Sequence, residues 1–159
     1  MENDYRSIKT FLDNTDDIDG LCESDAVVFI DWREYDENIV SYFNQKTNNK
    51  IRVEMQDNGK SYGDDIVLKY QEKTIAIPYD EKMDRDTTII YTNEIVRSDY
   101  EIRWCTDSLG SDTLGFVILE KPMWENLEAI FGQDKVRYYF EPVFPAKKCF
   151  AWILMKFLH

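Results

Sequence analysis

The sequence predicts an α+β fold: a single domain over residues 1–159, with a mostly antiparallel sheet of about six or seven strands and three or four helices. Apolar residues make up 43% and aromatic residues 14% of the 159-residue chain, which is enough for one hydrophobic core. The hydrophobic period switches repeatedly between helical and strand-like spacing. No internal repeat, low-complexity segment or Pro/Gly/Ser linker divides the chain.

The first 50 residues are predicted to form a helix, a loop, a strand and a second helix. The acidic loop "DNTDDIDGLCESD" (13–25) ends the first helix, whose apolar residues recur at helical spacing: Tyr5, Ile8, Phe11 and Leu12. "AVVFI" (26–30) has the β-branched content of a buried strand. Asp31 and Glu34 have the spacing of a capping box, which predicts a helix over about 33–46.

In the middle of the chain, apolar and polar residues alternate with a period of two. This places apolar side chains on one face of each of two or three antiparallel strands within residues 51–79, starting with Ile51, Val53 and Met55. Residues 84–97 can be read as helix or strand, and the common face of Ile89, Asn93 and Val96 favours a helix.

The last part of the chain is predicted to add three strands and a helix. A half-exposed strand is expected over 100–104, with Arg103 pointing outward, and the apolar "TLGFVILE" (113–120) is typical of a central strand. Pro122 begins a helix that ends before Gly132. "KVRYYFEPV" (135–143) is predicted to be a strand, with three side chains inward: Val136, Tyr138 and Phe140.

Residues 144–159 form an appended tail or an extra element. Their longest apolar run is about ten residues and contains a lysine, against the roughly 20 residues needed to cross a bilayer. No basic region followed by an apolar stretch opens the chain, so a cytoplasmic protein is expected.

The charge is strongly negative and unevenly distributed. The formal net charge is −12, and residues 1–48 hold twelve acidic and four basic residues. Such a field repels nucleic acid and anionic lipid and accelerates encounter with a basic protein, although acidity also serves solubility alone. We therefore expect no direct nucleic-acid or membrane partner.

The chain lacks the residues that several kinds of catalytic and metal site require. The single histidine is His159, the last residue, which argues against Ser-His-Asp, Cys-His and His-based metal sites. Cys22, Cys105 and Cys149 are too far apart for a disulfide framework or a zinc site, and Cys105 is expected to be a packed residue. No catalytic residue, metal or cofactor is predicted, and the chain is expected not to be an enzyme.

Two polar segments remain as candidate sites. "SLGSDTLG" (108–115) matches neither a nucleophile elbow nor a P-loop, so it is a turn held by side-chain hydrogen bonds, a protein-contact loop or, least favoured, a catalytic loop. "DNTDDIDG" (13–20) departs from the EF-hand pattern, because its third and sixth positions are Thr15 and Ile18. A solvated acidic rim is favoured there over a metal site.

Aromatic residues lie among the carboxylates. Tyr and Trp anchors surrounded by charge are the composition of a protein-docking face, and six rings are candidates, each of which could equally belong to the core: Trp32, Tyr35, Tyr62, Tyr79, Tyr91 and Trp104. The predicted partner-binding residues combine these rings with the acidic segments: Asp16, Asp17, Asp19, Tyr62, Asp64, Asp65, Trp104, Asp107, Ser108 and Asp112.

The segment "DYEIRWCTDSLGSDTLGFVILEKPMWENLEAIFGQDKVRYYFEPV" (99–143) resembles immunity proteins of bacterial contact-dependent and polymorphic toxin systems. The resemblance lies in a strand with Arg103 and Trp104, the "DSLGSDT" turn, an apolar strand, a "W..LE..FG" helix and a closing strand. It implies a cytosolic antidote that binds one cognate toxin domain, often a basic nuclease, and blocks its active site. It implies no catalytic residues.

The function predicted is therefore an antitoxin that neutralises its toxin by acidic complementarity and steric occlusion, as a monomer or a homodimer when free. One alternative is a metal-dependent hydrolase with an Asp cluster, in which Asp107 and Asp112 would be ligands. Another is an acidic regulatory adaptor with a different basic partner.

Overall fold

The computed structural model describes residues 1–61, 63–79, 83–108 and 112–143. Over these residues the fold contains six α-helices, one 3-10 helix and seven strands, all paired antiparallel, which confirms the α+β prediction. The strands form two sheets, in a chain that divides into two compact units: unit 1, Met1–Trp32 with Asp99–Pro142, and unit 2, Arg33–Ser98 with Val143–His159. No helix of the described residues is long and apolar enough to cross a bilayer.

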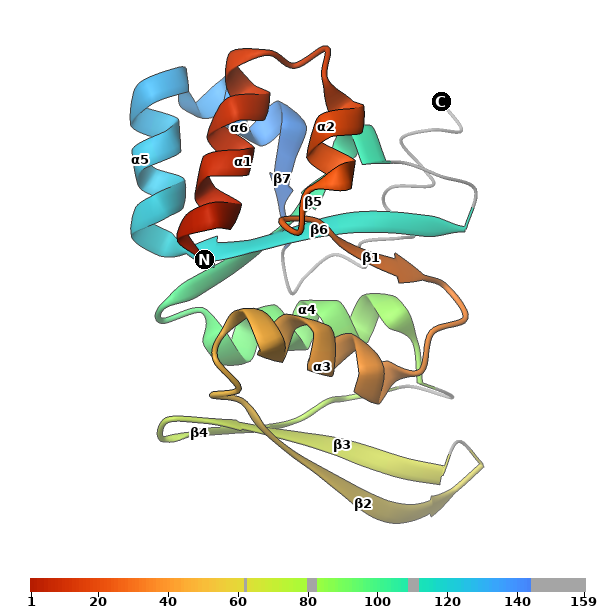
Figure 1. The fold of residues 1–159 in the computed structure, drawn as a ribbon. Coiled ribbons are helices and arrows are strands. Elements are labelled where there is room, and N and C mark those ends of the chain that lie inside the picture. Colours follow the sequence, from red (N-terminus) through yellow and green to blue (C-terminus); the bar gives the residue numbers. More distant parts are fainter. Residues whose placement is uncertain (62, 80–82, 109–111, 144–159) are drawn as a thin grey trace. The chain divides into compact units, whose positions relative to one another are not determined.

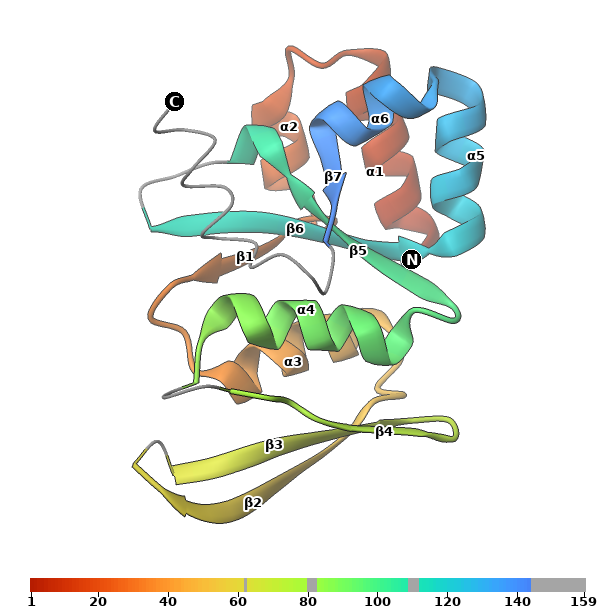
Figure 2. The same cartoon turned by 180° about the vertical axis from the view of Figure 1, so that it is seen from behind.

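Unit 1 is a four-stranded sheet with all of its described α-helices on one face (Figures 1 and 2). The strand order is β1-β6-β5-β7, with bounds β1 (Val28–Asp31), β5 (Tyr100–Cys105), β6 (Thr113–Glu120) and β7 (Phe140–Pro142). The helices are α1 (Glu2–Asp13), α2 (Ile18–Glu23), α5 (Lys121–Phe131) and α6 (Gln133–Tyr139), with the 3-10 helix η1 (Thr106–Ser108) between β5 and β6. β6 is central and buried on both faces, as predicted.

Helical spacing produces the core of unit 1. Ile8, Phe11 and Leu12 bury one side of α1, and Trp124 and Leu127 do the same on α5. They pack with apolar side chains of the sheet, among them Val117 and Leu119 of β6. Pro122 lies in the first turn of α5 and Gly132 follows its last residue at φ +90°, as the sequence predicts.

Unit 2 is a three-stranded sheet with two helices on one face (Figures 1 and 2). The order is β2-β3-β4, with bounds β2 (Arg52–Lys60), β3 (Gly63–Tyr70) and β4 (Lys73–Ala76). The helices α3 (Asp36–Lys46) and α4 (Arg85–Val96) pack on each other. The helix favoured over 84–97 is thus confirmed, and the carboxylate of Asp84 caps it by accepting from the Thr87 amide at 2.8 Å.

Two predicted elements differ in the structure. The loop 13–25 contains α2, which begins because Asp17 accepts from the Gly20 amide at 3.0 Å. The strand predicted over 135–143 is mostly α6, followed by the short β7; Val136 and Phe140 are buried as predicted, but Tyr138 is 69% exposed. A seven-residue segment is long enough for about two helical turns or for a strand, and packing decides between them.

The prediction of a capping box formed by Asp31 and Glu34 is wrong. Asp31 belongs to β1, where it pairs with Thr113, and α3 begins at Asp36. Glu34 still supports the helix start, because its carboxylate accepts from the Tyr35 amide at 3.1 Å and from the Asn38 side chain at 2.9 Å.

The buried face predicted for the first strand of unit 2 is only partly confirmed. Ile51 is buried, but Val53 and Met55 are exposed, although they pair with the buried Leu68 and Ile66. β2 is an edge strand, and all but one of its residues are exposed.

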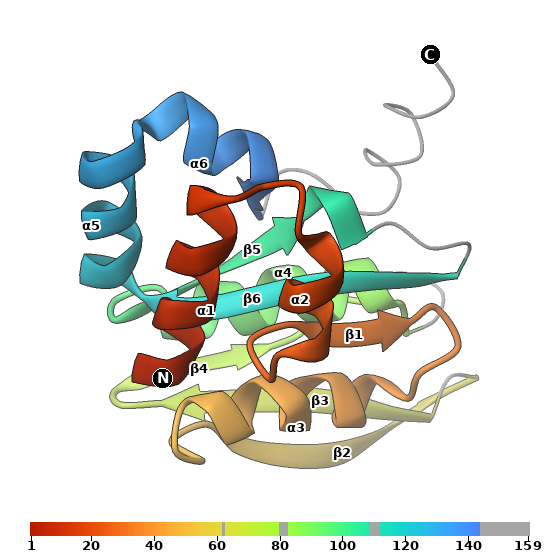
Figure 3. The same ribbon diagram turned by 45° about the horizontal axis from the view of Figure 1, so that its top comes forward.

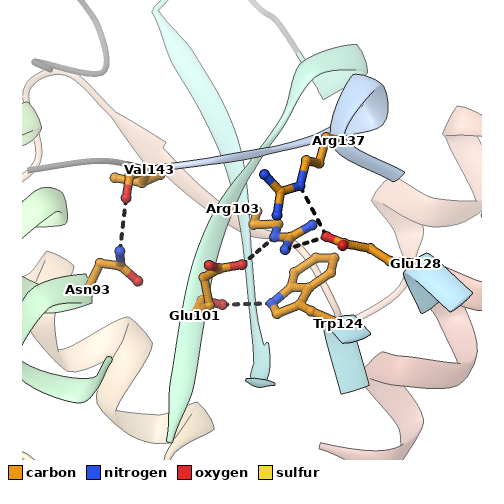
Figure 4. Close-up of polar contacts among 7 residues, drawn as sticks. All are labelled: Asn93, Glu101, Arg103, Trp124, Glu128, Arg137 and Val143. Carbon is orange, nitrogen blue, oxygen red and sulfur yellow. Dashed lines mark hydrogen bonds and ion pairs between the residues drawn. The ribbon is translucent and has the colours of Figure 1, made fainter. Parts of the chain in front are cut away.

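Arg103 is the largest departure from the predicted alternation. It is 3% exposed, whereas the sequence places it on the outer side of a half-exposed strand. Its Nε donates to Glu101 at 2.5 Å, its Nη2 pairs with Glu128 at 2.8 Å, and its guanidinium lies over the Trp124 ring, 4.4 Å from the centroid (Figure 4). Two carboxylates and an aromatic face thus compensate the buried charge.

A second buried polar group lies in unit 2, around the Thr88 hydroxyl. This hydroxyl lies 2.6 Å from the Tyr79 hydroxyl and 2.9 Å from the Asp84 carbonyl, and it contacts the carboxylate of Asp36. Thr88 has one proton to donate, so its hydroxyl donates either to the Asp36 carboxylate or to the Asp84 carbonyl. Burial raises the pKa of Asp36, and the negative charges of Asp84 and Glu37 raise it further.

Asp36→Asn is expected to gain stability relative to wild type as pH rises from 4 to 7. A folded-state pKa above the unfolded value means that Asp36 contributes stability below the unfolded pKa, which is lost as pH rises through the folded pKa. Each pKa unit between the folded and the unfolded state corresponds to about 1.4 kcal/mol in the free energy of unfolding. Urea unfolding of both proteins at the two pH values measures this, and a pH-independent difference would contradict it.

Candidate partner-binding surface

The two units differ sharply in charge. Unit 1 contains 18 acidic and 6 basic residues, whereas unit 2 contains 13 of each. Unit 1 therefore carries the whole formal charge of −12. Because the chain enters unit 1 twice, the acidic residues of 99–142 add to those of the first 32 residues.

The connection between α1 and α2, together with α2 itself, is rich in exposed acidic side chains. Residues 13–25 contain no basic residue, and all six of their acidic side chains are exposed: Asp13, Asp16, Asp17, Asp19, Glu23 and Asp25. Asp17 is fixed by its bond to the Gly20 amide. We call these six residues, with Asp107, the acidic surface.

Asp107 is part of this surface because α2 packs against η1 (Figure 3). Its side chain is exposed on η1, the turn that follows β5. The structure thus packs α2, which contains Asp19, against η1, which contains Asp107, although the two residues lie about 90 positions apart in the sequence. Three members of the acidic surface, Asp13, Glu23 and Asp25, belong to the same acidic stretch as Asp19 and were not among the predicted contacts.

Asp112 lies next to the exposed Trp32, at the edge strand β1 of the same sheet. Its carbonyl accepts from the Trp32 amide at 3.1 Å, which extends the pairing of β1 with β6. Trp32 is 57% exposed and Phe29 of β1 is 41% exposed. Phe29 was missed because "AVVFI" is apolar throughout and shows no alternation that marks its outer face.

Ser108 holds a turn, which favours the first of the three interpretations of its loop. Its hydroxyl donates to the Cys105 carbonyl at 2.5 Å and accepts from the Gly115 amide at 2.8 Å. A Cβ on Gly115 would lie 2.7 Å from the Ser108 hydroxyl and 2.6 Å from Val27, so glycine is required there. Residues 109–111 of the loop lie outside the described residues.

The other predicted contacts have different outcomes. The prediction that Trp104 is an exposed anchor is wrong, because this residue is 3% exposed. Tyr79 is buried as well. Tyr35 is exposed, Tyr91 is half-buried, and Tyr62 lies outside the described residues. Asp64 and Asp65 are half-buried in β3 of unit 2, where Asp65 accepts from the Asn58 side chain at 2.7 Å. The structure does not place them on the acidic surface.

Cys105 is a packed core residue, as predicted. It is fully buried, and burial raises the pKa of its thiol to about 12. We expect iodoacetamide at pH 8 to leave Cys105 unmodified in the native protein and to modify it in urea, because only the thiolate reacts. Mass spectrometry of the peptides that contain Cys105 and the half-buried Cys22 measures this, and native modification of Cys105 would contradict it.

A shallow cavity of about 230 Å³ lies between α1 and α2, next to the acidic surface. Phe11 and Leu21 are the buried apolar residues of its lining, and Arg6 and Asp17 are its charged residues. A Cβ on Gly20 would lie 2.4 Å from the Asp17 carboxylate, so the cap of α2 by Asp17 requires glycine at this position.

The comparisons with known proteins give no identification. No protein-family model, no curated protein and no solved structure matches the chain. Within the described residues, no three His, Cys, Asp or Glu side chains are grouped closely enough to hold a metal ion.

Proposed function

We propose that this chain is an immunity protein, which binds a cognate basic toxin domain of the nuclease class and blocks its active site. The observation that carries the proposal is the concentration of the whole net charge in unit 1, with seven exposed acidic side chains in residues 13–25 and η1. A cleft that binds the phosphates of nucleic acid presents Lys and Arg, and carboxylates can take the place of the phosphates.

The binding would combine charge with exposed rings. The acidic surface accelerates encounter, and the partly exposed Phe29 and Trp32 are of the residue types that slow dissociation once buried. A protein that must neutralise every toxin copy needs a dissociation constant on the order of nanomolar. No group on this chain has to react for such inhibition.

The test uses the polypeptide encoded directly upstream, where the toxin of an immunity protein is expected. Co-expression with this chain should restore the growth that the upstream polypeptide arrests, and calorimetry of the purified pair should give a 1:1 complex that weakens with salt. Growth arrest without rescue, together with no binding at micromolar concentration in low salt, would refute the proposal.

A thermal shift assay separates this proposal from a metal-dependent hydrolase. A metal bound to the native state raises the melting temperature. The proposal expects magnesium, manganese and calcium to act alike, through ionic strength only. A saturable increase with one of them, lost in Asp107→Asn or Asp112→Asn, would favour the hydrolase.

A further inference from the structure

Basic residues are rare in unit 1, and half of them line one cavity. Of the six, Arg103, Lys121 and Arg137 surround a space of about 180 Å³. They come from β5, α5 and α6, so the tertiary fold brings them together. Three glutamates and Trp124 complete the lining: Glu101, Glu125 and Glu128.

Several hydrogen-bond donors of this cavity have no acceptor among the described residues. Glu101 and Glu128 are both used by Arg103, and the same oxygen of Glu128 also accepts from Arg137 at 3.2 Å (Figure 4). Two guanidinium groups thus share one carboxylate oxygen. Within the described residues, Lys121 has no ion-pair partner, and the buried Nη1 of Arg103 has no hydrogen-bond acceptor.

An unpaired buried donor in a polar cavity calls for an acceptor. We propose that this cavity binds the carboxylate or phosphate group of a small molecule. Lys121 and the 43% exposed Arg137 supply charged donors, and the buried Nη1 of Arg103 supplies a further N–H group. The cavity is smaller than the roughly 300 Å³ of a drug-sized site, so it suits one small oxyanion.

Glu125 gives the proposal a sign test. It is exposed, it lines the cavity, and it makes no ion pair with the described residues. Its negative charge opposes an anion, whereas Lys121 and Arg137 favour one. Removing the negative charge of Glu125 should therefore raise the affinity for an anion, and removing the positive charge of Lys121 or Arg137 should lower it. A general loss of stability would not change the affinity in opposite directions.

The experiment titrates the full chain with inorganic phosphate and, separately, with acetate, at an ionic strength held constant with chloride. A saturable increase in melting temperature beyond that in chloride is expected for at least one of the two anions. Lys121→Gln and Arg137→Gln should each raise the dissociation constant about tenfold, and Glu125→Gln should lower it. Circular dichroism without added anion checks that each variant is folded.

The two anions identify the ligand class. A response to phosphate alone indicates a tetrahedral oxyanion, and a response to acetate as well indicates a carboxylate site. If phosphate, acetate and chloride act equally, or if the three variants keep wild-type affinity, the proposal is wrong. The outcome is independent of toxin binding, because no toxin is present.

Discussion

Arg103→Met is expected to lower the free energy of unfolding by about 3–5 kcal/mol, the usual cost of removing one partner of a buried ion pair. The variant is destabilised because the carboxylates of Glu101 and Glu128 lose their cationic partner. Glu101 and Glu128 lie in a partly buried pocket, with 27% and 16% of their side chains exposed, and each has Arg103 as a partner. Methionine keeps most of the volume, so the variant removes charge and hydrogen bonds more than packing. Urea unfolding measures the effect.

Arg137→Gln is the matched control. Arg137 pairs with the same oxygen of Glu128, but its side chain is 43% exposed, so water replaces it and a loss of no more than about 1 kcal/mol is expected. The double variant Arg103→Met with Glu128→Gln should be more stable than Arg103→Met alone, because the stranded carboxylate is removed. Equal losses for Arg103→Met and Arg137→Gln would contradict this account.

The ion pairs among Arg103, Glu128 and Arg137 also predict that stability depends on pH. Burial tends to raise the pKa of Glu128, but its bonds and ion pairs with Arg103 and Arg137 outweigh burial and hold that pKa below the usual value. A lowered folded-state pKa gives stability above the unfolded pKa that is lost as pH falls through the folded pKa. Arg103→Met should therefore lose less stability than wild type on acidification.

The triple variant Asp16→Lys, Asp19→Lys, Glu23→Lys is expected to bind a basic toxin about 10- to 100-fold more slowly at low salt. Long-range attraction raises association rates by roughly 10- to 1,000-fold, and reversal turns part of the acidic surface repulsive. Asp17 is left unchanged because it caps α2. Stopped-flow association kinetics at increasing salt measure the effect, and the wild-type rate should fall more steeply with salt.

The control for this variant reverses three exposed acids of the neutral unit 2: Glu37, Asp57 and Glu72. Both triple variants change the net charge equally, so the comparison separates a specific surface from the overall charge. A larger loss in the unit 1 variant supports the acidic surface. Equal losses would show that net charge alone steers association, and the assignment of the surface would be wrong.

The sequence determined the fold class and the elements with strong local patterns. α1, β1, β6 and α5 lie where spacing, β-branched content and Pro/Gly signals predict them, because those signals act within about one turn or one strand. Elements with weak or mixed signals, such as α2 and α6, depended on packing. The acidic stretch 13–25 was visible in the sequence, since a run of carboxylates with no basic residue among them stays in water wherever the chain folds.

The tertiary structure alone decided which distant residues meet. It buried Arg103 and Trp104, which the alternation of β5 placed on opposite faces of a half-exposed strand, and it surrounded Arg103 with residues of α5 and α6. It also joined the first 32 residues to 99–142 in one unit that holds the entire net charge. Periodicity describes one element at a time, whereas burial and ion pairing depend on what packs against it.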